Sequence, residues 1–428
     1  MKSMPLPRRD LPSFVEVAQP LPSAHIDECR AEVQRRLFDF GLRERVKSGH
    51  RIAITAGSRG FGGFLPILSG IAAAVRDCGA EPFLIPAMGS HGGATPAGQT
   101  EILRRLGVTD EIAPICATMD TLTLRKAPNG AVAHLDRYAS EADGIIVLGR
   151  TKTHPESSEG LASGLLKMVT IGLGKQKGAA EAHSHGLWDS VRQVPRIVMS
   201  KAKIVCGVAV VENGLRQPLE IEIVPPNYEA FLESDQRLLV LARQHLAKIP
   251  FDHLDVLILD EIGKTVSGAG MDPNVIGRWR VTREGPRNPD YRRIVVLSLT
   301  SASLGNGLGI GLADFTTRRF QQAYDPDVSY INLLTASEPG GNTGEGPMPI
   351  ALPTDRQAIE VALYSSLAGP EPRLCRAHNT GDLAKLWISE ALMPEAESKG
   401  LRVIGELQPL PFTPTGDLLP GRFTPLES

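Results

Sequence analysis

The chain has 428 residues, of which 42% are hydrophobic and 22% charged; this is ordinary globular composition and enough length for two domains. Its formal net charge is -2, with Lys and Arg spread along the chain, so composition gives no case for a nucleic-acid-binding or anionic-membrane surface. The 5 cysteines form no CxxC pair, which argues against a disulfide framework or a Cys-based zinc site.

The N-terminal stretch MKSMPLPRRDLPSF has basic residues but no apolar run behind them, so it does not resemble a signal peptide. No apolar run approaches the roughly 18 residues that span a bilayer. We therefore expect a soluble, cytoplasmic protein with no membrane or nucleic-acid partner. The oligomeric state is left open.

Short apolar runs recur along the chain, and most are continuous rather than alternating, as in strands buried on both faces of a parallel sheet. They cover residues 51–55, 82–86, 144–148, 203–211, 256–260 and 294–299. Helical patterns lie between them, after Ser23, over residues 65–78, and from Thr95-Pro96, where Thr is a good N-cap and Pro suits the first turn. The alternation predicts an α/β fold with mostly parallel sheets.

Residues 228–248 read as one amphipathic helix without Gly or Pro, before a fresh α/β segment that starts near Asp252. We expect two layered α/β domains, residues 1–248 and 249–428, with an active-site cleft between them. The tail after Leu407 is rich in Pro and Gly and predicts an irregular strap.

Glycine-rich loops follow four predicted strands, starting at Ala56, Ala87, Gly149 and Asp260. Ligands of open α/β sheets bind beyond the carboxyl ends of the strands, so four polar loops there suggest one assembled site, although any single loop could be a simple turn. The first loop, AGSRGFGG, offers Ser58, Arg59 and backbone amides to a phosphate or carboxylate. It matches neither a Walker loop nor the GxGxxG fingerprint.

Two histidines stand in such loops: His91 between glycines in GSHGG, and His154 in TKTHPE. Each alone is more often an ordinary loop residue, but together they make a plausible acid/base pair because imidazole titrates near neutrality. Lys167 sits in an apolar stretch, where an amine becomes nucleophilic or carries a covalent link, unless its head simply reaches water. His183 and His185 form an HxH pair that could bind metal.

The loop DEIGKTVSGAGMDPNVIGR packs Lys264, Asp272, Asn274 and Arg278 among glycines. This density of charge and glycine indicates the second domain's share of the cleft. The alternative is a turn stabilised by Asp272 and Asn274 bonding to nearby backbone.

The run GRTKTHPESSEGLASGLLKMVTIGLGKQKGA resembles the central segment of the nickel-pincer lactate racemase family, and GSHGGATPAGQ resembles that family's earlier histidine loop. The loop with GKTVSGAGMDPN looks like a signature of a divergent branch of the same family. The resemblance covers the blocks between Ile52 and Arg278, in matching order and spacing.

The resemblance implies a nickel-pincer nucleotide as cofactor: pyridinium-3-thioamide-5-thiocarboxylic acid mononucleotide with nickel. It implies a covalent tether at Lys167, a nickel ligand at His183, and acid/base roles for His91 and His154 during hydride transfer to and from the carbinol carbon of a 2-hydroxy acid. Ser58 and Arg59 match the loop that meets cofactor phosphate and substrate carboxylate. Lys264 is the candidate for the second domain's hold on the substrate.

The chain departs from the family pattern at Ala56, where an aspartate is usual, and at Gly92-Gly93, where Arg-Pro is usual. A smaller, less cationic wall suggests a substrate bulkier than lactate, such as a sugar acid. The function expected is thus a racemase or epimerase of a small hydroxy acid. Two alternatives remain: a cofactor-free isomerase or hydro-lyase using His91, His154 and Lys264 on a sugar acid, or a non-catalytic protein that binds nickel or a mononucleotide.

Overall fold

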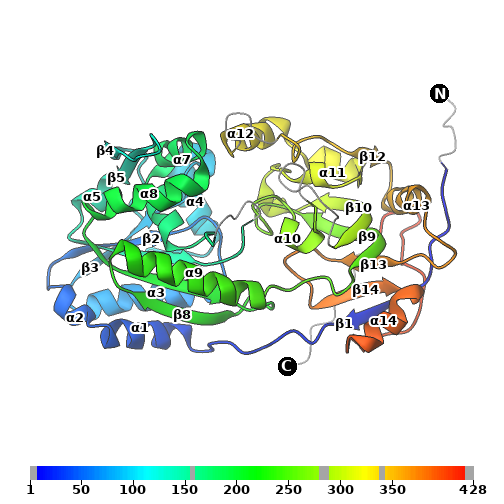
Figure 1. The fold of residues 1–428 in the computed structure, drawn as a ribbon, viewed down its shortest axis with the longest axis horizontal. Coiled ribbons are helices and arrows are strands. Elements are labelled where there is room, and N and C mark those ends of the chain that lie inside the picture. Colours follow the sequence, from blue (N-terminus) through cyan, green and yellow to red (C-terminus); the bar gives the residue numbers. More distant parts are fainter. Residues whose placement is uncertain (1–6, 155–159, 279–288, 337–342, 420–428) are drawn as a thin grey trace. The chain divides into compact units, whose positions relative to one another are not determined.

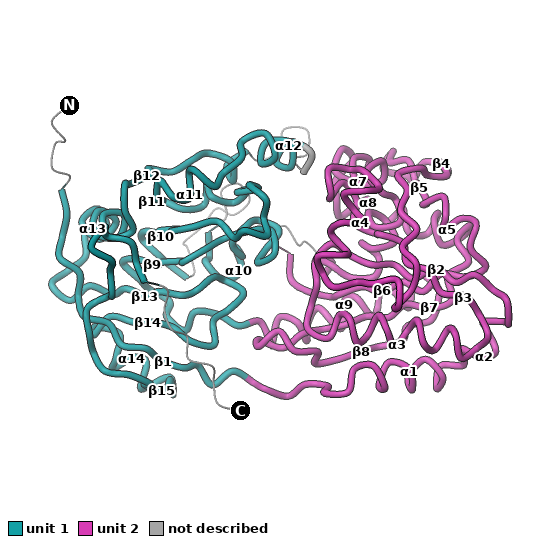
Figure 2. The backbone as a smooth tube through the Cα atoms, turned by 180° about the vertical axis from the view of Figure 1, so that it is seen from behind, with its two compact units in different colours: residues 1–21, 247–428 teal, residues 22–246 magenta. Residues whose placement is uncertain are grey.

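The computed structural model describes residues 7–154, 160–278, 289–336 and 343–419. The chain forms two compact units, unit 1 with residues 1–21 and 247–428 and unit 2 with residues 22–246 (Figure 2). These units differ from the expected ranges 1–248 and 249–428 at the N-terminus, because β1 (Phe14–Ala18) pairs with β14 (Lys385–Ser389) of unit 1. In sequence, unit 2 is an insertion within unit 1.

The main sheet of unit 2 has the strand order β3-β2-β6-β7-β8, in which all neighbours are parallel except the antiparallel pair β7 and β8 (Figure 1). A separate hairpin of β4 and β5 lies outside it. The strands of unit 2 are β2 (Arg51–Ala56), β3 (Glu81–Pro86), β4 (Thr121–Lys126), β5 (Val132–Asp136), β6 (Gly144–Arg150), β7 (Ile204–Glu212) and β8 (Pro218–Val224). The α/β fold with mostly parallel strands is confirmed.

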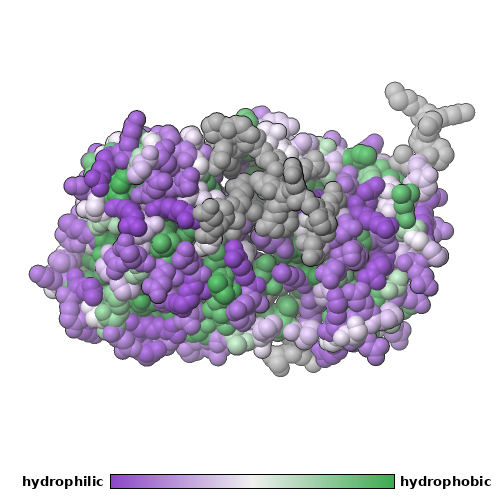
Figure 3. All heavy atoms as spheres, viewed as in Figure 1, coloured by the Kyte–Doolittle hydropathy of each residue, from purple (hydrophilic) through white to green (hydrophobic). Residues whose placement is uncertain are grey.

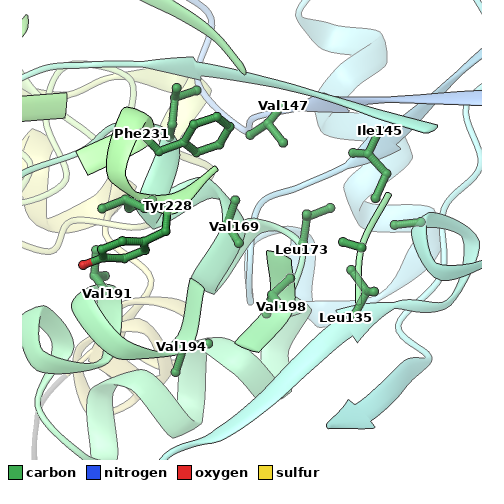
Figure 4. Close-up of a cluster of buried hydrophobic side chains, with 14 of the residues drawn as sticks. Leu135, Ile145, Val147, Val169, Leu173, Val191, Val194, Val198, Tyr228 and Phe231 are labelled. Atoms are coloured by element: carbon green, nitrogen blue, oxygen red, sulfur yellow. The ribbon is translucent and has the colours of Figure 1, made fainter. Parts of the chain in front are cut away.

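The parallel strands of this sheet are buried on both faces, which explains why they read as continuous apolar runs, whereas the edge strand β8 alternates. Successive side chains of a strand point to opposite faces, so Ile145 and Val147 of β6 join one apolar cluster while Ile146 and Leu148 join another. Figure 4 shows Ile145 and Val147 in the first cluster, with Phe231 among the side chains contributed by helices.

Helices cover the two faces of the sheet, and the predicted N-cap of one of them is present: the Thr95 hydroxyl accepts from the Gly98 amide at 3.1 Å. The helix predicted over 228–248 ends at Gln244. The helices of unit 2 are α1 (Cys29–Asp39), α2 (Leu42–Arg45), α3 (Phe64–Asp77), α4 (Pro96–Arg105), α5 (Arg137–Glu141), α6 (Leu165–Lys167), α7 (Lys175–Ser184), α8 (Leu187–Met199) and α9 (Tyr228–Gln244), with a 3-10 turn η1 (Gly92–Ala94) and a π-helical turn η2 (Met168–Gly172).

Unit 1 is built on a mixed sheet with the order β12-β11-β10-β9-β13-β14-β1-β15. The strands from β12 to β13 are parallel, and β14, β1 and β15 continue the sheet antiparallel. Besides β1 and β14, these strands are β9 (His253–Ile262), β10 (Asp290–Leu299), β11 (Phe315–Thr317), β12 (Ile350–Leu352), β13 (Leu374–Ala377) and β15 (Arg402–Val403).

The sheet of unit 1 likewise separates two apolar clusters. The predicted irregular tail packs against this core through Leu410 and Leu418, which are 5% and 6% exposed. The helices of unit 1 are α10 (Pro273–Ile276), α11 (Arg318–Ala323), α12 (Pro326–Ala336), α13 (Asp355–Ser365) and α14 (Met393–Ser398), with 3-10 turns η3 (Ser301–Ser303), η4 (Ile310–Leu312) and η5 (Glu390–Leu392).

On the face drawn in Figure 3, hydrophilic residues predominate and hydrophobic residues are interspersed among them. Within the described ranges, no helix combines the length and the apolar character needed to cross a bilayer.

Candidate functional site

A pocket of about 190 Å³ opens in unit 2, where β2, β3 and β6 end. Its walls include the loop after β2, the loop after β3, and the segment Ser163–Gly172 that follows β6. Four of the seven site residues predicted from the sequence line it, namely Ser58, Arg59, His91 and Lys167, whereas His154, His183 and Lys264 are not among its lining residues. Because neighbouring parallel strands end at one edge of the sheet, three loops far apart in sequence meet there.

The loop after β2 is held against the β7–β8 turn by close backbone packing. A Cβ on Gly62 would lie 1.9 Å from the Arg216 carbonyl oxygen, so only glycine fits. The Gly62 amide also donates to the Glu212 carboxylate at 2.8 Å. These contacts present Ser58 and Arg59 to the pocket.

Burying the guanidinium of Arg59 costs free energy of folding. Its Nε is buried with no hydrogen-bond partner among the described residues. Burial, and secondarily the charge of Arg150, lowers the pKa of Arg59 to about 10. A buried donor without a partner costs free energy, which an anion bound at this point would recover.

The pocket wall is strongly cationic. Arg150, at the end of β6, and Lys152 line it together with Arg59 and Lys167, and none of the described lining residues is acidic. Arg150 itself is paired with Glu212. The arrangement suits a ligand that carries a carboxylate or a phosphate.

His91 begins the 3-10 turn η1 in the loop after β3. The two glycines after His91 differ in their surroundings. Gly92 packs on the backbone of Gly98, whereas a Cβ on Gly93 would meet nothing within 4 Å. The backbone of α4 leaves no space for a Cβ on Gly92, and the roomier wall expected from Ala56 and Gly92-Gly93 stays a prediction.

Lys167 lies at the junction of α6 and the π turn η2, whose defining bond runs from the Leu173 amide to the Met168 carbonyl at 2.9 Å. Such π turns often occur at functional sites. Asp235 of α9 caps the start of α6, accepting from the amides of Leu165 and Leu166 at 2.8 and 2.9 Å. Burial raises the pKa of Asp235 to about 7, against the lowering effect of these two bonds.

His154 follows β6 and lies near enough to Lys167 and Arg59 for their charges to act on its imidazole. Burial, then the charges of Lys167 and Arg59, hold its pKa well below the ordinary value. Its ring meets the indole of Trp188 edge-to-face at 5.1 Å between centroids, and Lys167 Nζ lies 5.5 Å from the centroid of that indole. Trp188 therefore lies beside both predicted residues.

The two HxH histidines differ in setting. His183 is the residue of this pair whose charge bears on His154. The His185 ring Nδ1 lies 3.0 Å from the Glu181 carbonyl oxygen, at the end of α7. Neither imidazole lines the pocket, and the described residues contain no group of three His, Cys, Asp or Glu that could hold a metal by themselves.

Lys264 lies in unit 1 and is not among the residues that line the pocket of unit 2. Its Nζ donates to the Gly268 carbonyl at 2.6 Å within its own loop. Asp272 caps α10 by accepting from the Asn274 amide at 2.9 Å, and Arg278 is buried with Nη1 2.7 Å from the Asp314 carboxylate. These contacts match the alternative of a stabilised turn.

Sequence reasoning missed Arg150, Lys152, Trp188 and Asp235. Arg150 and Lys152 flank a strand end that had already been singled out, so their place after β6 was the available signal. Trp188 and Asp235 come from α8 and α9, whose contacts with this loop leave no local pattern in the sequence.

Fold and pocket define an α/β protein with a cationic ligand site at the carboxyl ends of a parallel sheet. No family model matches the chain, and no curated protein matches it significantly. Among solved structures, the chain is similar to the lactate racemase apoprotein from Thermoanaerobacterium thermosaccharolyticum, with a TM-score of 0.43 and 13% identity over 82% of this chain and 85% of that one. A likeness at this level does not decide the family or the activity of this chain.

Proposed function

We propose that the protein is a racemase or epimerase that inverts the carbinol carbon of a small 2-hydroxy acid with the help of a nickel-pincer nucleotide. The observation that carries the proposal is the pocket in which Ser58, Arg59, His91 and Lys167 come together from three separate strand-end loops. Each of these side chains has a distinct task in that chemistry, and the sequence motifs resemble the lactate racemase family at the same positions.

The residues present fit such a cofactor. The Arg59 Nε is buried without a partner among the described residues, and a nucleotide phosphate or a substrate carboxylate could provide one. The described side chains include no ready-made metal centre, so a metal here would need most of its ligands from an organic group. A pincer nucleotide does this with its own sulfur atoms, and it supplies a hydride acceptor when bound.

The chain's own residues then bind, orient and move protons. Ser58 and Arg59 hold the anionic group, Lys167 provides the amine for the covalent tether, and the His183 imidazole is the metal ligand. His91 and His154 exchange the proton of the substrate hydroxyl. Burial and the neighbouring cations favour the neutral form of the His154 imidazole, which is the form that can accept that proton.

The test is to express the chain with enzymes that make the nucleotide, and then to measure bound nickel, the mass of the peptide containing Lys167, and inversion of lactate, malate and aldonates by chiral chromatography. We expect nickel, a mass increase on Lys167 and inversion of at least one substrate. Lys167→Met should lose all three.

Lys177→Met is the matched control, because Lys177 is an exposed lysine on the neighbouring helix α7. It should keep metal, adduct and turnover. Isomerase or hydro-lyase activity in protein that lacks both nickel and the adduct would contradict the proposal, and so would a loaded protein that inverts none of the substrates.

A further inference from the structure

A buried lysine, Lys175, lies behind the pocket and takes no part in the proposed chemistry. Its side chain and that of Asp136 are both 0% exposed, with 3.5 Å between Nζ and the carboxylate. The ammonium also donates to the Pro86 carbonyl at 2.6 Å and to Gln99 Oε1 at 2.8 Å. Two of its donors therefore bond acceptors on the His91 side of the fold, and the Asp136 carboxylate faces it at ion-pair distance.

Gln99 links Lys175 to the loop that carries His91 by hydrogen bonds to both. It is 0% exposed, and its Nε2 donates to the Gly89 carbonyl at 2.9 Å and the His91 carbonyl at 3.2 Å. An ammonium can only donate, so Gln99 must turn its oxygen to Lys175 and its NH₂ group to the loop. The chain Asp136–Lys175–Gln99 thus fixes the backbone at Pro86, Gly89 and His91.

The buried ion pair and the backbone conformation of Lys175 both cost free energy of folding. Lys175 adopts φ +55°, in the left-handed region that a non-glycine residue rarely occupies. Burial lowers the pKa of Lys175 and raises that of Asp136, and each charge opposes the effect on its partner. Apolar residues of similar volume often replace buried ion pairs without loss of stability, so a geometric role is the better explanation.

We propose that Lys175 is a positioning residue, which acts through Gln99 to hold the His91 imidazole at its place in the pocket. This inference rests on the proposed function only for the task of His91. The positioning itself is a property of the protein without any ligand.

The experiment compares Lys175→Met, which keeps length without charge, with Gln99→Glu and Gln99→Met, which keep the ion pair but lose the donors to the loop. Ring carbon signals of histidine-labelled protein are recorded by NMR, and the His91 signal is assigned by its loss in His91→Gln. We expect the His91 signal to shift and broaden in all three variants, while the His154 signal and phosphate binding stay as in the wild type.

In the loaded enzyme, kcat should fall by about 100-fold with KM changed little, as for a misplaced acid/base group. Gln99→Met provides the answer if Lys175→Met does not fold. An unchanged His91 signal in Gln99→Met overturns the inference, whatever the activity. A displaced His91 signal supports it even if the wild type proves to invert no hydroxy acid, so failure of the proposed function would be recognised separately.

Discussion

The backbones of Gly92 and Gly98 lie directly against each other. A Cβ on Gly98 would stand 2.0 Å from the Gly92 carbonyl oxygen, and a Cβ on Gly92 would stand 2.5 Å from the Gly98 carbonyl carbon. The turn that carries His91 therefore packs directly on the first turn of α4, backbone against backbone.

Gly98→Ala should destabilise the protein and displace the His91 turn. Replacing glycine by alanine inside a helix ordinarily stabilises by about 1 kcal/mol, but here the methyl group meets backbone that cannot yield. We expect a loss of about 1–3 kcal/mol in urea unfolding. Gly369→Ala is the control, because a Cβ there meets nothing within 4 Å. A stabilised Gly98→Ala protein would show that the two backbones can separate.

Asp235→Asn should change how stability depends on pH. The folded-state pKa of Asp235, about 7, lies above its ordinary value of 3.8, so its contribution is complete below about pH 4 and is lost as pH rises towards 7. Asparagine cannot ionise and keeps one of the two capping acceptors. The variant should be less stable than the wild type at pH 5, by about 1–2 kcal/mol, and this deficit should shrink or reverse by pH 8.

Urea unfolding at pH 5, 6, 7 and 8 measures this difference. Asp189→Asn makes the same chemical change at an exposed position of α8 and should show no comparable trend. A deficit of Asp235→Asn that stays constant from pH 5 to 8 would mean that Asp235 remains ionised throughout.

Arg59→Met should separate ligand binding from stability. The buried guanidinium has a like charge nearby and an Nε with no partner in the described part of the chain, so its removal should leave the free energy of unfolding in plain buffer unchanged or slightly higher. Phosphate at 100 times its Kd should stabilise the wild type by about 2.7 kcal/mol and the variant by much less. Thermal unfolding over a phosphate series measures this, with the exposed Arg105→Met as control. Equal protection of both proteins would place the anion elsewhere.

Arg376→Met should destabilise unit 1. Arg376 is 1% exposed and forms a bidentate pair with Asp260, at 2.7 and 2.9 Å. Loss of the guanidinium leaves a partly buried carboxylate unpaired, which costs about 3–5 kcal/mol. Adding Asp260→Leu should recover most of this loss in urea unfolding, since the pair is then replaced by apolar groups. A double variant no more stable than the single one would contradict this account.

Local patterns in the sequence were sufficient to predict the strands around the pocket. Each of these strands is buried on both faces, so it is a continuous apolar run that ends in a polar, glycine-rich loop. Ser58, Arg59 and His91 could be named because they stand in those loops, and Lys167 because it interrupts an apolar stretch. Their convergence in one pocket follows from parallel strands ending at one edge.

Features that depend on distant contacts were not predictable. The pairing of Phe14 with Ser389 joins the two ends of the chain, and neither segment shows a sign of its partner. Lys175 reads as one more lysine in a polar helix, and its burial appears only once α7 packs behind β3 and β5. The ligand-binding role predicted for the glycine-rich loop at Lys264 stays a prediction, because a well-bonded turn and a ligand-binding loop use the same residue types.

The insertion of unit 2 within unit 1 has a consequence for the order of events during synthesis. Strand β1 leaves the ribosome before unit 2, yet both of its partners, β14 and β15, are made after unit 2. The pocket-bearing unit can complete its own core in the meantime, while the N-terminal segment waits with open edges. A nascent chain halted once residue 246 has emerged from the ribosome should therefore already contain the anion pocket while β1 still has unpaired edges, and we expect chaperones to bind this state.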